Sequence, residues 1–514
     1  MSLKAAIEQH YFQLMKNLEF GIRIGLRTIL PLLIVFSATG YTFQSRTDIL
    51  SVPGILIDAC FADLDGDSIS EAMLFYIDGG SERIQRKLAI YRNVGDGFDS
   101  QPTQVLEIDG SAACYDIADI NADGRKDLLL CGTGGMISHA FDGRMFDINP
   151  NKAPSAKTIF NIAPETEIVR WKFVVYPPGQ SGSLMLVPTP VGFDLFRIGP
   201  GGPKFSQSLE YRHRLKIGGR PAHYTNDPAG FVLDCRLPSV VVGNYDGDRM
   251  ADIFVLSDRF VQIYRGNFDG GYSPQPVEIF GNRLLTEEEE LTGDVALSFK
   301  VQDLNSDGLS DIIATKNAGT VTSFNTTISI FRARQLGGYG SKCNREFSMA
   351  NGASSPTILD FNGDGALDLA LPSFRLGVMS TLKILLMKKI EVNLRIYLQG
   401  GEGDFPDKHG YEKGFSYEVL LDEGIHYANI LILDGDYDGD GAYDLLIHDG
   451  QGKLKAYKNR QNGLFSDNSM INISLPRPDE LAAEDLNGDG KHEIIAFYSG
   501  NIGERKCLRV VWID

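Results

Sequence analysis

The sequence predicts an all-β fold in which a unit of about four short strands is repeated around a ring. Three features recur along the chain: a nine-residue acidic string, a short apolar run directly after it, and an aromatic piece further along each unit. The mean spacing between units is (485 − 63)/7, about 60 residues, with strand rather than helix periodicity. Such units are the blades of a β-propeller. We therefore expect about eight four-stranded blades, with seven as the alternative.

Composition restricts the class of protein. The chain has 514 residues, of which 43% are hydrophobic and 23% charged, so it can bury a core and global disorder is excluded. Its 49 basic and 67 acidic residues give a net charge of −18. This charge argues against a nucleic-acid partner bound through its phosphates and suits a protein that collects cations.

The first forty residues have the pattern of an export signal. An apolar run from Ile29 to Ala38 follows Arg23 and Arg27 and precedes small residues. The run is short for a membrane-spanning helix, which needs about 20 apolar residues. We expect residues 1–40 to be a signal peptide, with Met15 as an alternative start, and the protein to be exported to the periplasm, the cell surface or the medium. An uncleaved membrane anchor and a buried N-terminal helix are the alternatives.

The acidic string occurs seven times, from DLDGDSISE in the first unit to DLNGDGKHE in the last. Its positions 1, 3 and 5 are always Asp or Asn, and position 9 is always Asp or Glu. Turn formation alone explains one or two of these side chains, not four at fixed spacing. The residues concerned are Asp63, Asp65, Asp67, Glu71, Asp119, Asn121, Asp123, Asp127, Asn244, Asp246, Asp248, Asp252, Asp303, Asn305, Asp307, Asp311, Asp360, Asn362, Asp364, Asp368, Asp436, Asp438, Asp440, Asp444, Asp485, Asn487, Asp489 and Glu493.

An eighth unit retains the frame of the string without its carboxylates. In it, Val175, Pro177, Gly179 and Ser183 stand at positions 1, 3, 5 and 9, and LMLVP copies the apolar run. We expect this unit to form a strand, a turn and a strand, and to bind no metal. The last unit has room for only three strands, so we expect Tyr41 to Leu50 to supply the fourth and to close the ring over residues 41–514.

Carboxylates at this spacing on a glycine-rich turn are hard oxygen ligands brought to one side of a loop, which is what calcium requires. An EF-hand is excluded because its position 12 is here always apolar, as at Leu74 and Leu130. Position 6 is Gly in five strings, which suggests a positive φ there. The sequence therefore predicts up to seven Ca²⁺ ions.

The string between two strands, followed by aromatic pieces such as IYRNVGDGF at Tyr91, resembles the FG-GAP or VCBS repeat of integrin-α-like β-propellers. The resemblance covers essentially residues 41–514. It implies a calcium-binding propeller whose side chains at positions 1, 3, 5 and 9 and carbonyl at position 7 hold the ion. Asn244 and Arg249 depart from the pattern and weaken the third string.

Other features carry less chemistry. The histidines form no zinc or triad pattern. Cys114 and Cys131 flank the second string and would face each other across a hairpin, either as a disulfide or as buried thiols. The acidic run Glu287 to Glu290 is typical of a solvated loop. The insertion at 375–392 is either a buried packing element or a docking element for a membrane or a protein.

Two function classes remain open. The first is a non-catalytic, calcium-stabilised binding or adhesion propeller outside the cytoplasm, whose loops face a protein or glycan partner. The alternative is a carbohydrate-active enzyme similar to a polysaccharide lyase. The enzyme would need basic and aromatic residues that converge on the central channel.

Overall fold

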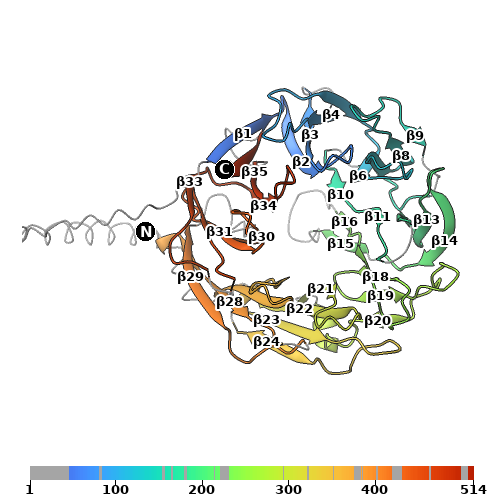
Figure 1. The fold of residues 1–514 in the computed structure, drawn as a ribbon. Helices are drawn as coiled ribbons and strands as arrows, with labels where there is room; N and C mark the ends of the chain where they lie inside the picture. The colour runs from blue at the N-terminus through green and yellow to red at the C-terminus, as the bar shows by residue number, and fades with distance from the viewer. Residues whose placement is uncertain are drawn as a thin grey trace, which may run out of the picture. The chain divides into compact units, whose positions relative to one another are not determined.

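The computed structural model describes residues 45–79, 84–152, 157–163, 166–178, 182–213, 215–219, 231–292, 295–320, 323–350, 352–375, 384, 386–400, 403–418, 431–461, 465–498 and 507–513. The predicted signal at 1–40 lies outside these residues. Residues 43–514 form one compact unit, and within it eight four-stranded blades are arranged in a ring (Figure 1). The predicted all-β fold with eight blades is confirmed. Among the described residues, no helix is long and apolar enough to cross a membrane.

The first four blades follow one another along the chain, each a run of antiparallel strands. Blade 1 contains β2 (Ile55–Ala62), β3 (Glu71–Asp78), β4 (Gln85–Tyr91) and β5 (Gln104–Ile108). Blade 2 contains β6 (Ala112–Ala118), β7 (Asp127–Gly132), β8 (Gly135–His139) and β9 (Asn151–Lys152). Blade 3 contains β11 (Val174–Val175), β12 (Leu184–Thr189), β13 (Gly192–Arg197) and β14 (Lys204–Glu210). Blade 4 contains β17 (Ser239–Gly243), β18 (Asp252–Leu256), β19 (Val261–Tyr264) and β20 (Glu278–Phe280).

The next three blades follow the same plan. Blade 5 contains β21 (Val295–Gln302), β22 (Asp311–Thr320), β23 (Ser323–Phe331) and β24 (Arg345–Met349). In blade 6 the first strand is split, and the blade contains β25 (Gly352–Ser354), β26 (Thr357–Leu359), β27 (Asp368–Arg375), β28 (Lys389–Tyr397) and β29 (Tyr411–Glu418). Blade 7 contains β30 (Leu431–Gly435), β31 (Asp444–His448), β32 (Lys453–Tyr457) and β33 (Ile471–Ser474).

The ring closes in blade 8 with strands from both ends of the chain. Its strands are, in spatial order, β34 (Glu480–Glu484), β35 (Glu493–Tyr498), β36 (Cys507–Ile513) and β1 (Ser45–Ser51). β1 pairs with β36 over seven residue pairs, and Asp48 accepts hydrogen bonds from Trp512 Nε1 (2.9 Å) and from Phe98 N in blade 1 (3.0 Å). The predicted closure by the N-terminal strand is confirmed for Ser45 onward.

Eight hydrophobic clusters hold the ring together, and each joins two neighbouring blades. The second strand of blade 4 shows how one strand contributes to two of these clusters. Ile253 and Val255 pack toward blade 3, whereas Phe254 and Leu256 pack toward blade 5. Because alternate residues of a strand point to opposite faces, the short apolar run after each string fills two interfaces at once.

Buried side-chain amides add polar links between blades. Asn459 of blade 7 donates to the carbonyl of Phe361 in blade 6 (2.8 Å), and Gln399 of blade 6 donates to that of Leu304 in blade 5 (2.8 Å). Asn93 of blade 1 donates to the carbonyl of Leu486 in blade 8 (2.9 Å). Each acceptor is position 2 of the acidic string in the preceding blade. The aromatic piece of one blade therefore anchors the loop of its neighbour.

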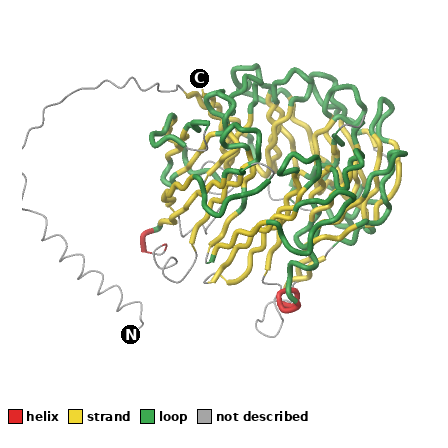
Figure 2. The backbone as a smooth tube through the Cα atoms, turned by 60° about the horizontal axis from the view of Figure 1, so that its bottom comes forward, coloured by secondary structure: helices red, strands yellow, loops and turns green. Residues whose placement is uncertain are grey.

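Three features interrupt the regular plan: an extra strand, a separate pair of strands and a helix. β10 (Val169–Arg170) pairs in parallel with β6, and β15 (Leu215–Gly219) with β16 (Phe231–Cys235) forms a separate hairpin between blades 3 and 4. The helix α2 (Glu287–Thr292) lies beyond the strand ends, among the red segments in Figure 2. It corrects the prediction of a solvated loop at Glu287 to Glu290.

Two reciprocal hydrogen bonds between side chain and backbone cap the N-terminus of α2. Glu289 N donates to Thr286 Oγ1 (3.3 Å), and Thr286 N donates to the Glu289 carboxylate (2.8 Å). This reciprocal pair is a capping box, and acidic residues in a first turn also favour the helix dipole.

The remaining expectations for the fold are partly settled. Cys114 lies opposite Cys131 across β6 and β7, and both are buried free thiols.

Of the insertion at 375–392, Ile384 is buried in a small cluster with Ile390, Val392 and Tyr417. Leu386 and its neighbour Met387 are exposed, and residues 376–383 and 385 lie outside the described part.

Candidate functional site

The acidic strings occupy the same place in seven blades, between the first and second strands. Each string begins at the residue after the first strand, and its position 9 is the first residue of the second strand. Blade 1 is typical: β2 ends at Ala62, and β3 begins at Glu71. Loops of equal length thus join equivalent strands, with carboxylates at equivalent positions.

Backbone amides of each loop are bound by its own side chains. In blade 6, the two carboxylate oxygens of Asp360 accept hydrogen bonds from Gly363 N (2.7 Å) and Gly365 N (2.8 Å). Asn362 accepts from Asp364 N (3.0 Å), and Asp364 accepts from Ala366 N (2.8 Å). These successive Asx turns hold positions 1, 3 and 5 on one side of the loop.

Positive φ angles complete the loop geometry. Position 6 has a positive φ in all seven strings, including the two without glycine, Ser68 (70°) and Arg249 (68°). The prediction for position 6 is confirmed. Position 4 is also left-handed in all seven, for example Gly363 (74°) and Ala122 (59°). Glycine stands at position 4 in five strings, so this second turn was also visible in the sequence, although only position 6 was predicted.

The carboxylate side chain at position 9 is buried in every loop and links the loop to its blade by hydrogen bonds. Asp444 accepts hydrogen bonds from Tyr437 N (3.0 Å) at position 2 and from Asn459 N (2.8 Å) after the third strand. Burial, together with the nearby carboxylates, raises the pKa of Asp444 and of Glu493 to about 7. A buried carboxylate among other carboxylates is unfavourable unless a cation compensates it.

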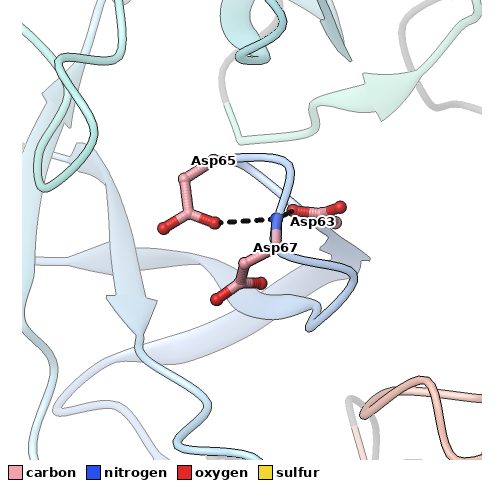
Figure 3. Close-up of side chains that lie close together, drawn as sticks. All are labelled: Asp63, Asp65 and Asp67. Carbon is pink, nitrogen blue, oxygen red and sulfur yellow. Dashed lines mark hydrogen bonds between the residues drawn. The ribbon is translucent and has the colours of Figure 1, made fainter.

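Two loops bring three carboxylates together most closely. Oxygen atoms of Asp63, Asp65 and Asp67 lie within 4.8 Å of one another, and Figure 3 shows these side chains on one turn. Asp436, Asp438 and Asp444 form a second group by the same measure. No other group of three or more acidic, Cys or His side chains meets it within the described residues. The remaining predicted ligands occupy equivalent loop positions but are not gathered this tightly.

Several oxygens in the loops lack a hydrogen-bond donor. Asp303 Oδ1 and Asn305 Oδ1 in blade 5 are buried, and no described residue donates to them. In blade 7, Asp438 Oδ1 also lacks a donor, although Lys458 Nζ pairs with the other oxygen of this carboxylate. Buried acceptors without donors are rare in folded proteins, and a hard cation would satisfy them. The donor set of oxygens alone fits Ca²⁺ better than a transition metal.

The degenerate unit of blade 3 has the expected form. β11 and β12 pair antiparallel through Val174 with Met185 and Val175 with Leu184, as expected for the two strands of the unit, and residues 179–181 between them lie outside the described part. Carboxylates are absent from its frame positions in the sequence. Its freedom from metal stays a prediction.

A separate pocket opens at the inner strands of blades 8 and 1. It has a volume of about 300 Å³, and its lining includes Asp58, Glu480, Glu484 and Arg170 of the extra strand β10. Asp58 accepts a hydrogen bond from Tyr115 Oη (2.9 Å), and burial raises the pKa of Asp58. Three acids against one base make the pocket mainly acidic. The pocket was not predicted from the sequence because β10 belongs to no repeat unit.

Comparison with known families identifies the repeat. A family model described as FG-GAP-like repeat matches residues 303–371 and 436–496. FG-GAP-like repeats occur in these two stretches of the chain. The stretches begin at Asp303 and Asp436, the first residues of the strings in blades 5 and 7. No curated protein matches the sequence significantly.

Several solved structures are similar to this β-propeller at low identity. One is an Agrocybe aegerita lectin described as recognising non-reducing terminal N-acetylglucosamine (16% identity, TM-score 0.42, covering 91% of this chain and 98% of the lectin). Another is the Vibrio cholerae biofilm matrix protein Bap1 (10%, TM-score 0.30, 90% and 88%). A third is the Nup133 β-propeller domain of Vanderwaltozyma polyspora (10%, TM-score 0.35, 81% and 96%).

Proposed function

We propose that this protein is a calcium-stabilised propeller that binds a ligand outside the cytoplasm. The observation that carries the proposal is the recurrence of one carboxylate loop at the same place in seven blades, with buried oxygens that no described donor satisfies. Side chains at positions 1, 3, 5 and 9, from Asp63 to Glu493, would hold Ca²⁺ together with the carbonyl at position 7. Extracellular calcium modules typically bind with Kd of about 10⁻⁴–10⁻³ M, which suits export and the N-terminal pattern.

The pocket at blades 8 and 1 is our candidate for the ligand-binding site. About 300 Å³ is room for a small group such as one sugar unit, and the polar groups of Asp58, Glu480, Glu484 and Arg170 would fix its orientation. Because acids outnumber bases, the pocket favours a neutral or cationic glycan over a uronic-acid polymer. The same acidity speaks against the lyase alternative, whose substrate is an acidic polymer.

A glycan-binding experiment tests this function. Immobilised neutral, amine-bearing and uronic-acid glycans are probed with the protein in calcium. We expect retention on neutral or amine-bearing glycans, and loss of retention for Arg170→Ala or Glu480→Gln without a change in melting temperature. Glu412→Gln, on the outer strand β29, is the control and should bind normally. Retention only on uronic-acid glycans, or turnover of them, would contradict the proposal.

A further inference from the structure

Blades 4 and 7 carry a basic residue at one shared position. Arg265 directly follows β19 and Lys458 directly follows β32, in each case after a tyrosine. The register of the second and third strands shows the equivalence. Tyr264 lies opposite Ile253 and Tyr457 lies opposite Leu445, and both partners are the residue after position 9. This position places the basic side chain beside the acidic loop of its own blade.

In blade 4, the guanidinium of Arg265 binds two predicted metal ligands. Its Nε forms an ion pair with Asp246, and its Nη2 lies 3.3 Å from Asp248 Oδ2. The Asp246 side chain is only 1% exposed, so the carboxylate of this ion pair is shielded from solvent. The loop has Asn244 in place of an acid at position 1, which lowers its affinity for a divalent ion further.

In blade 7, the ammonium of Lys458 binds the same two positions. Its Nζ forms an ion pair with Asp438, and lies 2.8 Å from Asp440 Oδ2. The Asp438 side chain is 8% exposed. Asp438 belongs to the close acidic group with Asp436 and Asp444, so the ammonium of Lys458 already lies against that group.

Other blades show that a basic residue at this position need not enter the loop. Arg332 follows β23 in blade 5, but its Nη2 lies 2.7 Å from Asp404 in blade 6, not from its own string. Arg92 follows β4 in blade 1, and no ion pair within the described residues reaches Asp63, Asp65 or Asp67. In blade 2 the equivalent residue is Ala140, and the Arg125–Asp123 pair there is exposed on both sides, so it contributes little.

We propose that Arg265 and Lys458 are built-in cations that take the place of the metal ion in the loops of blades 4 and 7. This inference rests on the proposed calcium binding. A divalent ion entering either loop would have to displace a paired cation from positions 3 and 5 and then lie close to it, which is repulsive. Two of the seven loops are excluded in this way, so about five would bind calcium at millimolar concentration.

Calcium content tests the inference. Each protein is dialysed to equilibrium against 1 mM Ca²⁺, and bound ion is measured by atomic spectroscopy. We expect about five ions in the unaltered protein, and about one more in Arg265→Met and in Lys458→Met, because methionine keeps the apolar stem without the charge. Arg332→Met is the matched control and should leave the number unchanged.

A second readout separates a binding effect from a folding defect. In EDTA, Arg265→Met and Lys458→Met should melt below the unaltered protein because each leaves buried aspartates unpaired. Added calcium should raise the melting temperature of both variants more than that of Arg332→Met. If a methionine variant does not fold, the glutamine substitution at the same position is used.

The outcomes distinguish this inference from the proposed function. Seven ions in the unaltered protein, with no gain on substitution, would overturn the inference and leave calcium binding intact. Five ions with no gain in either variant would also overturn it. No bound ion in any protein would overturn the proposed calcium binding itself, and the inference with it.

Discussion

At the scale of residues, the loops combine closely spaced oxygen side chains with backbone strain. Five strings use glycine at position 6, but Ser68 and Arg249 take the left-handed conformation without it. For a residue with a side chain this conformation is unfavourable by about 1–2 kcal/mol. Such strain persists only where the rest of the loop holds it in place, here by hydrogen bonds to the side chains at positions 1, 3 and 5.

Replacing Arg249 with glycine should stabilise the folded protein. Relief of the strain, less the greater backbone freedom of unfolded glycine, gives an expected gain of about 0.5–1 kcal/mol in the free energy of unfolding. Urea unfolding in EDTA measures it without the contribution of metal. Gly365→Ala is the converse control: a Cβ there meets nothing within 4 Å, and φ is +86°, so the variant should lose about 1–2 kcal/mol by conformation alone. Destabilisation by Arg249→Gly would contradict this account.

The loops and the spacing of their carboxylates were visible in the sequence, and that spacing is the reason we predict a cation there, because turn formation does not require four oxygen side chains at fixed positions. The partners of those side chains were not predictable. Arg265 and Lys458 lie 17 and 20 residues from Asp248 and Asp438, and only the register of the hairpin brings them to the loop. The buried, hydrophobic position 2, such as Leu64 or Leu486, was visible in the sequence as an apolar residue inside an acidic string, but its role in the interface between blades depends on the ring.

At the scale of elements, the blades are linked by amide side chains as well as by apolar packing. Asn459 is fully buried, and its Nδ2 donates to two carbonyls, Phe361 O in blade 6 and Tyr443 O in its own blade. Its own N–H donates to Asp444, at position 9 of the string. One residue thus connects the loop, the hairpin and the neighbouring blade.

Asn459→Ala should destabilise the ring. One buried carbonyl and one half-buried carbonyl lose their donor, and an unsatisfied buried group is unfavourable by about 1–3 kcal/mol, so we expect a loss in that range. Thermal unfolding at fixed calcium measures it. Asn472→Ala, at an exposed position of β33, should change stability by less than about 0.5 kcal/mol. Equal effects of the two substitutions would show that the amide link contributes nothing.

The strands of the repeat were predictable, and the elements outside the repeat were not. The capping box of α2 is legible as Thr286 followed three residues later by Glu289, but the acidic run alone suggested a loop. β10 has only two residues, and its parallel pairing with β6 leaves no periodicity to detect. The hairpin of β15 and β16 falls in the longer interval between the units at 175 and 244, where the sequence shows extra length without showing its form.

At the scale of the whole molecule, ring closure depends on joining the two ends of the chain. β1 is the outer strand of blade 8, and Asp48 connects it to Trp512 of that blade and to Phe98 of blade 1. Arg46 lies over the Trp512 ring at 5.3 Å from its centroid. Each contact joins residues remote in sequence, so opening the ring loses them together.

Deleting residues 1–51 should therefore lower the melting temperature and leave the edge of β36 unpaired. Asp48→Ala should have a smaller effect in the same direction because it removes one acceptor of two hydrogen bonds. Glu107→Ala, at an exposed site on β5, is the control and should melt like the unaltered protein. Differential scanning calorimetry measures all three, and unchanged melting after the deletion would rule out closure by β1.

The central claim is that the acidic loops hold calcium and that calcium stabilises the ring. Its most direct test is calorimetry of the folded protein in EDTA, in calcium and in magnesium. An ion that binds only the folded state stabilises it by about 3–4 kcal/mol per site at 100 to 1,000 times Kd. We predict a large rise in melting temperature with calcium that magnesium does not reproduce, because Mg²⁺ keeps its water and avoids all-protein sites. Substituting Asn at Asp360, Asp364 and Asp368 together should reduce the rise, whereas Ser183→Ala in blade 3 should not. An identical melting temperature in EDTA and in calcium would show that the strings are only turns and would contradict the account.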